Sequence, residues 1–293
     1  MGSRVTAPAI RARKVATGAQ PLVMVTAYDA PGARMVDEAG ADIILVGDSL
    51  AMVVLGYDDT LSVTVEDMAH HTAAVARTKP QALVVADLPW LSYHVSVEDT
   101  VRNAATLIRA GAGAVKLEGG AKRTAMVRAI VDAEIPVMGH IGLTPQSIHA
   151  MGGFKVQGKD ADAALALVTD AKALVTAGVF SIVLECVPDS VARMVTDAVG
   201  VPTIGIGAGP HCDGQVLVLH DLLGLEDRIT PKFVRRYASM KADGVAAIAA
   251  FAADVRSGSF PNDAESYHLP AAAAAELGID VDELVGLYGT ISA

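Results

Sequence analysis

The sequence predicts a (β/α)8 barrel, a closed ring of eight parallel strands with helices on its outer face. Short apolar runs rich in β-branched residues recur along the chain, and a longer amphipathic or alanine-rich stretch follows most of them. Near-continuous apolar runs are typical of parallel strands that are buried on both faces. Glycines stand just past predicted helix ends at Gly40, Gly111 and Gly178. Strand–helix units of this kind over roughly 250 residues match the barrel.

The predicted elements alternate along the chain. The strands are Leu22–Thr26, Ile43–Gly47, Leu83–Ala86, Ala114–Leu117, Val137–Ile141, Ile182–Cys186, Thr203–Gly207 and Val216–Leu219. The helices are Pro31–Ala39, Val65–Arg77, Val97–Arg109, Lys122–Ala133, Asp160–Ala177 and Ser190–Ala198. An open, doubly wound sheet is the rival fold. It usually carries a glycine-rich fingerprint after its first strand, where this chain has Thr26-Ala27-Tyr28-Asp29. The barrel is therefore the better match.

We expect a single barrel domain over residues 1–262 and an acidic C-terminal extension over residues 263–293. The barrel domain opens with a short basic segment. No Lys or Arg follows Arg256, while Asp and Glu continue to the end of the chain. The extension is expected to be partly helical from Pro270 onward.

Composition excludes several classes of protein. The chain has 23 Lys+Arg against 33 Asp+Glu, for a net charge of −10, and only 4% aromatic residues. This balance argues against nucleic-acid binding, which needs a basic face and stacking side chains. Mean hydropathy is positive, but no apolar run reaches the ~18–20 residues of a membrane-spanning helix. The longest candidate, Val245–Ala253, is alanine-rich and is interpreted as a packed helix.

Cysteine use and the N-terminus indicate a cytoplasmic protein. Cys186 and Cys212 are too few for a disulfide framework and do not form a CxxC pair. Cys186 lies within an apolar run, so we expect a buried and inert thiol. The basic N-terminus lacks the apolar segment of a secretory signal.

The most informative feature is a set of ionisable residues at successive predicted strand ends. The active sites of such barrels lie at the carboxyl ends of the strands. Because strand side chains alternate between faces, Lys116 and Glu118 share one face of their strand, and the same parity lets the other charged residues point into the barrel mouth. The residues are Asp48, Asp87, Lys116 with Glu118, His140 and Glu185.

Each of these residues also has a structural interpretation. An Asp at a strand end commonly caps a helix or belongs to a turn. Lys116 and Glu118 could form an ion pair within the barrel, and a single His140 is often a hydrogen-bonded core residue. Glu185 is harder to explain, because burying a carboxylate costs several kcal/mol unless it is paired or protonated. Taken jointly, the convergence of these charges favours a functional site.

The chemistry of the carboxylates suggests a metal. Asp48, Asp87 and Glu118 offer hard oxygen ligands without a cysteine, which favours Mg²⁺ over Zn²⁺. An ion held by two or three carboxylates keeps open positions for a bidentate α-keto acid and would stabilise an enolate as a Lewis acid. Lys116 could neutralise the same developing charge, and Glu185 is placed for general-base work, which benefits from a raised pKa.

Two glycine-rich stretches allow more than one interpretation. Gly205–Pro210 could cradle an anion near the usual phosphate position of a barrel, or form a tight loop in which glycines give backbone clearance. Its spacing and location do not fit a dinucleotide fingerprint. Met151–Gly158 is a long loop of the kind that forms lids or subunit contacts.

A long ordered set of motifs resembles the ketopantoate hydroxymethyltransferase family from about Leu22 to Pro261. The motifs are Val46-Gly47-Asp48-Ser49-Leu50, Gly56-Tyr57-Asp58, Ala86-Asp87-Leu88-Pro89, Val115-Lys116-Leu117-Glu118-Gly119-Gly120, Gly139-His140-Ile141-Gly142-Leu143-Thr144-Pro145-Gln146, Gly152-Gly153-Phe154, Leu184-Glu185-Cys186-Val187-Pro188, Gly205-Ile206-Gly207-Ala208-Gly209-Pro210 and Cys212-Asp213-Gly214-Gln215.

The resemblance implies a barrel of the phosphoenolpyruvate/pyruvate-type superfamily and a Mg²⁺-dependent aldol-type reaction. In the family, 3-methyl-2-oxobutanoate takes a hydroxymethyl group from 5,10-methylenetetrahydrofolate, giving 2-dehydropantoate and tetrahydrofolate in the first step of pantothenate synthesis. Family members form ring-like homo-oligomers, often decamers, so a homo-oligomer is expected here. The expected partners are small-molecule substrates, with no nucleic acid and no membrane.

The resemblance also assigns roles to individual residues. It implies metal ligands at Asp48, Asp87 and Glu118, keto-acid-binding positions at Asp48, Ser49, Asp87 and Lys116, the proton acceptor at Glu185, and a possible active-site residue at His140.

Two alternative hypotheses about the function are also compatible with the sequence. The first keeps the barrel and the Mg²⁺-enolate chemistry but makes the chain a C–C or P–C lyase of the same superfamily. The second is a non-catalytic barrel that serves as a binding or scaffold protein, in which the charged strand ends would lack a purpose.

Overall fold

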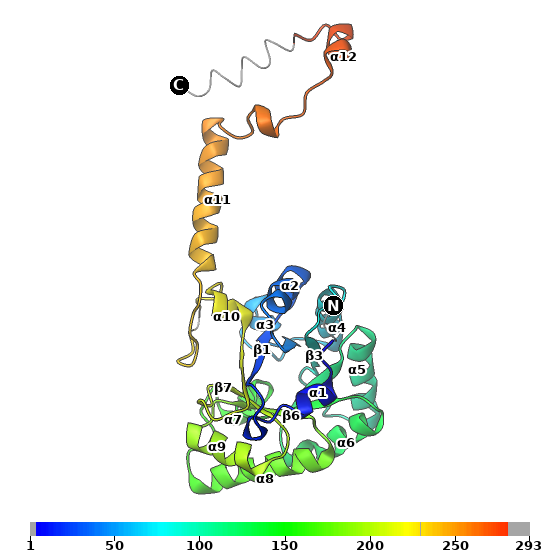
Figure 1. Cartoon of the computed structure of the whole chain (residues 1–293), viewed down its shortest axis with the longest axis vertical. Helices are drawn as coiled ribbons and strands as arrows, with labels where there is room; N and C mark the ends of the chain where they lie inside the picture. Colours follow the sequence, from blue (N-terminus) through cyan, green and yellow to red (C-terminus); the bar gives the residue numbers. More distant parts are fainter. Residues whose placement is uncertain (1–3, 229, 281–293) are drawn as a thin grey trace. The chain divides into compact units, whose positions relative to one another are not determined.

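The first compact unit of the chain is a closed barrel of eight parallel strands in sequence order (Figure 1). The computed structural model describes residues 4–228 and 230–280. Strand β1 pairs with both β2 and β8, which closes the ring and confirms the predicted fold. The strands are β1 Leu22–Thr26, β2 Ile43–Val46, β3 Leu83–Asp87, β4 Ala114–Glu118, β5 Val137–Gly142, β6 Ser181–Glu185, β7 Thr203–Ile206 and β8 Gly214–Leu217.

Helices follow the strands and begin at side chains that cap them. Asp29, Ser96 and Asp160 each accept a hydrogen bond from a backbone N–H of the first turn, and Thr64 forms a capping box with Asp67. The helices of this unit are α1 Ala7–Arg11, α2 Ala30–Glu38, α3 Leu50–Val53, α4 Val65–Ala76, α5 Val97–Arg109, α6 Thr124–Asp132, α7 Ile148–Met151, α8 Ala161–Ala177, α9 Asp189–Ala198 and α10 Leu219–Leu223; short 3₁₀ turns lie at η1 Val15–Thr17, η2 Ala121–Arg123 and η3 Pro145–Ser147.

Every strand except β1 differs by one or two residues at an end from the sequence prediction, and the shifts at β6 and β8 have a visible physical cause. β6 ends at Glu185 rather than at Cys186, because Cys186 has a left-handed φ of 48° that turns the chain out of the strand. β8 begins at Gly214, and Leu219 instead begins α10, with its N–H donating to the hydroxyl of Thr26 at 2.9 Å. Both shifts come from contacts with neighbouring strands that periodicity does not encode.

The barrel interior is a packed core below the carboxyl ends of the strands. Its centre is formed by inward-facing side chains, and Ala7 and Ile10 of α1 cluster with residues at the strand starts, so that α1 closes the amino end of the barrel. The core also contains Leu22, Met24, Ile43, Leu45, Leu83, Val85, Ala114, Met138, Phe180, Val183, Ile204 and Val216. The carboxyl end of the barrel remains available for a site.

Residues 223–225 and 237–280 belong to a second compact unit. It contains α11 Met240–Ser257, η4 Asp263–Glu265 and α12 Ala271–Glu276. The expected domain boundary at 262 stays a prediction. Within the described residues, α11 buries none of its side chains, so the predicted helix exists there without the expected packing. No helix of the described chain is long and apolar enough to cross a membrane. The expected extension continues over residues 281–293, which lie outside the described residues.

Candidate active site

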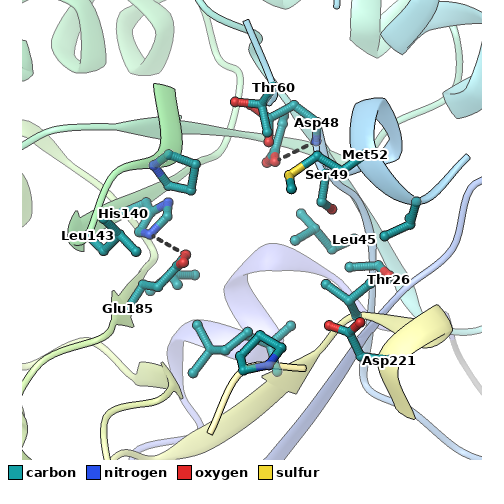
Figure 2. Close-up of a pocket in the computed structure, with 18 of the residues that line it drawn as sticks. Thr26, Leu45, Asp48, Ser49, Met52, Thr60, His140, Leu143, Glu185 and Asp221 are labelled. Atoms are coloured by element: carbon teal, nitrogen blue, oxygen red, sulfur yellow. Dashed lines mark hydrogen bonds and ion pairs between the residues drawn. The ribbon is translucent and has the colours of Figure 1, made fainter. Parts of the chain in front are cut away.

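A cavity of about 510 Å³ opens at the carboxyl ends of the strands (Figure 2). Every ionisable residue that the sequence places at a strand end lines it, as does Ser49 beside them. These residues are Asp48, Asp87, Lys116, Glu118, His140 and Glu185. The predicted convergence of charges is therefore present in the structure, while the roles of the individual residues remain predictions.

Asp48, Asp87 and Lys116 form one buried cluster of the site. The backbone N–H of Asp48 donates to Asp87 Oδ2 at 3.1 Å, and Lys116 Nζ lies 3.1 Å from Asp87 Oδ1. The side chains of Lys116 and Asp87 are only 5% and 3% exposed. One ammonium group therefore faces more than one carboxylate in a place that water reaches poorly.

The crowding of like charges shows in the acid–base properties. Burial, followed by the nearby carboxylates of Asp87 and Glu118, raises the pKa of Asp48 well above its usual value. Burial also raises the pKa of Asp87, although Lys116 opposes this shift. Burial alone would lower the pKa of Lys116, but the surrounding carboxylates outweigh it and raise that pKa. Lys116 therefore stays protonated at neutral pH, and the carboxylates around it outnumber its single positive charge.

His140 joins the two glutamates of the site. Its Nδ1 lies 3.3 Å from Glu118 Oε1. Its Nε2 lies 3.2 Å from Glu185 Oε2, a contact that Figure 2 shows. Burial and the charge of Lys116 would lower the pKa of His140, but the two carboxylates raise it to about 9. Lys116 Nζ also lies 3.3 Å from the same Nδ1, so His140 lies between the ammonium group of Lys116 and the two carboxylates.

Glu185 differs from the other carboxylates in its exposure. Its side chain is 17% exposed, against 3% for Glu118 and Asp87, so it reaches into the cavity instead of being buried as the sequence suggested. The left-handed Cys186 follows directly and also lines the cavity. Burial raises the pKa of Cys186 to about 11, so its thiol stays protonated at neutral pH. The expected inertness has a physical basis, although the residue is only partly buried.

Gln146 and Tyr93 are two residues that the sequence reasoning did not assign to the site. Gln146 Nε2 donates to Asp48 Oδ2 at 2.8 Å, and the backbone N–H of Gln146 donates to Glu118 Oε2 at 3.0 Å. The hydroxyl of Tyr93 donates to Gln146 Oε1 and accepts from the backbone N–H of Glu118. The motif that contains Gln146 was a signal for it, whereas no sequence pattern points to Tyr93.

A divalent cation fits the donor set. Asp48 and Asp87 are adjacent buried carboxylates whose repulsion a cation would relieve. A Cβ at Gly47 would come within 2.9 Å of Ser49 Oγ, so the glycine leaves space for the hydroxyl beside these carboxylates. In the described part of the chain, no three His, Cys, Asp or Glu side chains are gathered as a ready metal site, and both oxygens of Glu118 already have partners. Both oxygens of Asp87 are engaged as well, by Lys116 and by the backbone N–H of Asp48. The choice of Asp48 and Asp87 therefore rests on their mutual repulsion, because Asp87 is the largest charge effect on the pKa of Asp48.

The other walls of the cavity are largely apolar. Phe154, from the glycine-rich loop after β5, and Phe233 both line it. A Cβ at Gly207 would come within 2.8 Å of the Phe233 ring, so this positive-φ glycine allows the close approach. The stretch 205–210 thus serves as a tight loop with backbone clearance, and the loop over 151–158 contributes to the site directly.

Comparisons with known proteins decide the family. The family profile described as ketopantoate hydroxymethyltransferase matches residues 4–263. The chain belongs to the ketopantoate hydroxymethyltransferase family. The 3-methyl-2-oxobutanoate hydroxymethyltransferase of Moorella thermoacetica is 58% identical over 266 residues, which cover 90% of this chain and 98% of the relative. The enzyme of the same name from Heliobacterium modesticaldum is 52% identical over 289 residues, covering 98% and 100%.

Membership of the ketopantoate hydroxymethyltransferase family confirms the resemblance seen in the motifs and identifies the chain with a family of transferases. Solved structures confirm the fold. A phosphonopyruvate hydrolase matches with a TM-score of 0.59 and 14% identity over 98% of both chains. A 2,3-dimethylmalate lyase, described as a member of the PEP mutase/isocitrate lyase superfamily, matches with a TM-score of 0.54 and 17% identity over 99% of both chains. At these identities the likeness is one of architecture.

Proposed function

We propose that this chain transfers a hydroxymethyl group from 5,10-methylenetetrahydrofolate to 3-methyl-2-oxobutanoate, forming 2-dehydropantoate and tetrahydrofolate. One observation carries the proposal. The cationic Lys116 and the carboxylate of Glu185, which reaches into the cavity, share that cavity with the neighbouring Asp48 and Asp87. Family membership supports the substrates and the place of the reaction at the first step of pantothenate synthesis. The alternative hypothesis of a lyase has no comparable support, because the lyase and hydrolase structures named above share only 17% and 14% of their sequence with this chain.

The keto acid would bind at the polar end of the cavity. Its carboxylate and keto oxygens need positive charge, because Asp48 and Asp87 alone would repel them. Lys116 supplies one positive charge at this end, and the hydroxyl of Ser49, which lies 2.9 Å from the hydroxyl of Tyr28, offers a hydrogen bond. Asp48 and Asp87 would hold Mg²⁺, which when bound supplies Lewis-acid polarisation of the keto-acid oxygens.

Glu185 would take the proton from C3 of the keto acid. Its carboxylate faces the cavity, and His140 Nε2 lies 3.2 Å from its Oε2. A base on a rigid strand, held by a neighbour, keeps the short distance that proton transfer requires. Lys116 would stabilise the negative charge that grows on the substrate oxygen, because its ammonium group stays cationic throughout the reaction.

The overall reaction then balances as follows. C3 loses a proton and forms a bond to the one-carbon unit, whose bonds to the two folate nitrogens break. Water supplies the hydroxyl oxygen, and its two hydrogens end on those nitrogens. The proton removed by Glu185 is accounted for by the hydroxyl hydrogen of the product, so the carboxylate is regenerated.

A turnover assay with both substrates tests the proposal directly, and exchange of the C3 proton tests its first step alone. Protein loaded with Mg²⁺ should exchange this proton in deuterated buffer, as measured by NMR without folate. Exchange by Glu185→Gln should fall by about 10²–10⁴-fold with substrate binding kept. Glu98→Gln, an exposed glutamate in the first turn of α5, is the matched control. Absence of exchange in folded, metal-loaded protein rejects the enolate route.

The resemblance also supports assembly into a ring-like homo-oligomer, with a decamer as the expected size. Sedimentation velocity at several protein concentrations measures this directly. A single species with the mass of one chain of 30.1 kDa would reject the proposed assembly.

A further inference from the structure

Asp221 is a cavity carboxyl that the proposed chemistry does not use. It belongs to α10 and lies across the cavity from Glu185 (Figure 2). Among the described residues, no hydrogen bond or ion pair engages its carboxyl. Two other acidic side chains of the same wall are different, because Glu226 is paired with Arg228 at 3.0 Å and Asp58 is exposed.

The surroundings of Asp221 make this lack of partners costly. Burial and the nearby Glu226 raise the pKa of its carboxyl to about 6, against the pull of Arg236. At neutral pH the group is still mostly ionised, in a cavity whose lining also includes Val218, Phe233 and other apolar side chains. A partly buried carboxylate without donors is the kind of group that a ligand with N–H donors satisfies.

The cavity also has room for more than the keto acid. Its volume of about 510 Å³ lies within the range of about 300–1,000 Å³ that holds drug-sized ligands. The keto acid is small and is drawn to Lys116 and the aspartates at one end. Asp221 and the aromatic rings of Phe154 and Phe233 also line the cavity, and a lining of this kind suits a flat ring system with polar atoms along one edge.

We propose that Asp221 accepts two hydrogen bonds from the 2-amino-4-oxopyrimidine edge of the reduced folate, which makes it the residue that recognises the one-carbon donor. The inference rests on the proposed function. The ring N–H and the exocyclic amine of this edge point the same way and match the two oxygens of a carboxylate, as a guanidinium does. With this edge at Asp221 and the keto acid beside Glu185, the one-carbon unit lies between the two groups.

The first test is the Asp221→Asn variant, which keeps the shape of the side chain but loses its charge and one acceptor. We expect the KM for 5,10-methylenetetrahydrofolate to rise by about ten- to a hundred-fold, the size expected for charge-assisted hydrogen bonds. Asp58→Asn, which removes an exposed carboxylate at the same mouth, should leave this KM unchanged. A rise of equal size in the control would overturn the assignment, since it would reflect the general charge of the mouth.

A folate analogue tests the contact itself. Tetrahydrofolate with a methyl group in place of its 2-amino group should bind the wild-type protein about ten-fold or more weakly than tetrahydrofolate, as measured by calorimetry. The Asp221→Leu variant, which has no acceptor at this position, should lose little or nothing further on the same change, because the partner is already gone. Equal losses in both proteins would overturn the proposed contact.

Failure of this inference can be told from failure of the proposed function. C3 proton exchange needs the keto acid but no folate, so its absence in the wild-type protein counts against the proposed function. Exchange in the wild type together with an unchanged folate KM in Asp221→Asn overturns only the role of Asp221. A fall in kcat with unchanged folate KM and binding would likewise overturn recognition, because it would indicate a proton-transfer role instead.

Discussion

Two buried lysine–aspartate pairs lie at opposite ends of the barrel, and they are built differently. At the amino end, Lys14 Nζ lies 2.8 Å from Asp213 Oδ2. At the carboxyl end, Lys116 Nζ lies 3.1 Å from Asp87 Oδ1. The pairs have the same chemistry and similar burial, so the difference between them must come from their surroundings.

The pair at the amino end is complete. Asp213 accepts hydrogen bonds from the backbone N–H groups of Val15 and Thr203, and Lys14 also donates to the carbonyl oxygens of Thr196 and Val201. Each polar atom has a partner and the charges balance. Such a network ties the N-terminal segment, η1, to the strands around it and has no capacity left for a ligand.

The pair at the carboxyl end is incomplete. In the described chain, Asp87 Oδ1 is buried and has Lys116 as its ion-pair partner but no hydrogen bond. Asp48 and Glu118 add further negative charge around the same ammonium group. A buried ion pair with excess negative charge around it is stabilised when a cation or a substrate binds. In this respect a binding site differs from a structural salt bridge, whose charges already balance.

The largest expected effect comes from breaking each pair in turn. Lys116→Met should lower kcat about 10²–10³-fold, because the cation that balances charge on the substrate is lost. Its stability should fall less than expected for a broken pair, since Asp87, whose pKa is already raised, can take up a proton. Lys14→Met should leave kcat of the folded protein near the wild-type value and lower the free energy of unfolding by about 3 kcal/mol.

Urea unfolding and initial rates measured on the same two variants check this contrast. Lys14→Arg is the matched control, because it keeps the charge beside Asp213 and should recover much of the stability. Loss of activity in Lys14→Met under conditions where the protein is fully folded would contradict the separation of the two ends.

A second effect, smaller in size, concerns the network that positions the carboxylates of the site. Gln146→Met removes the donor to Asp48 Oδ2 while keeping the length of the side chain. Mutation of such supporting partners typically weakens metal binding by about 10–100-fold, and we expect this range for Mg²⁺ measured by calorimetry without substrate. Gln81→Met, at an exposed position, is the control. Unchanged Mg²⁺ affinity in Gln146→Met would show that the amide does not orient the site.

These contrasts also show what the sequence could predict. The bounds of β1 and α5 agree with the predicted ranges, because their apolar periodicity and caps are local. The strand-end charges were predictable because alternation along parallel strands sends them to one mouth. Gln146 contacts Asp48 across 98 residues of chain, and Asp221 reaches the site from a short helix that replaces the predicted end of β8. Such contacts depend on how strands register, which periodicity does not contain.

The smallest expected effect is on the pH dependence of the free energy of unfolding, to which the carboxyl of Asp221 contributes. The pKa of Asp221 is raised from 3.8 to about 6 by burial and Glu226. A carboxyl with a raised pKa favours folding below its unfolded pKa, and this contribution is lost as the pH rises through 6. Wild-type protein should therefore gain about 1 kcal/mol relative to Asp221→Asn between pH 7 and pH 5, a value reduced for the partial exposure of the group. Urea unfolding of both proteins at these two pH values measures the difference, and parallel stabilities at both pH values would mean that solvent, rather than the protein, sets the protonation of Asp221.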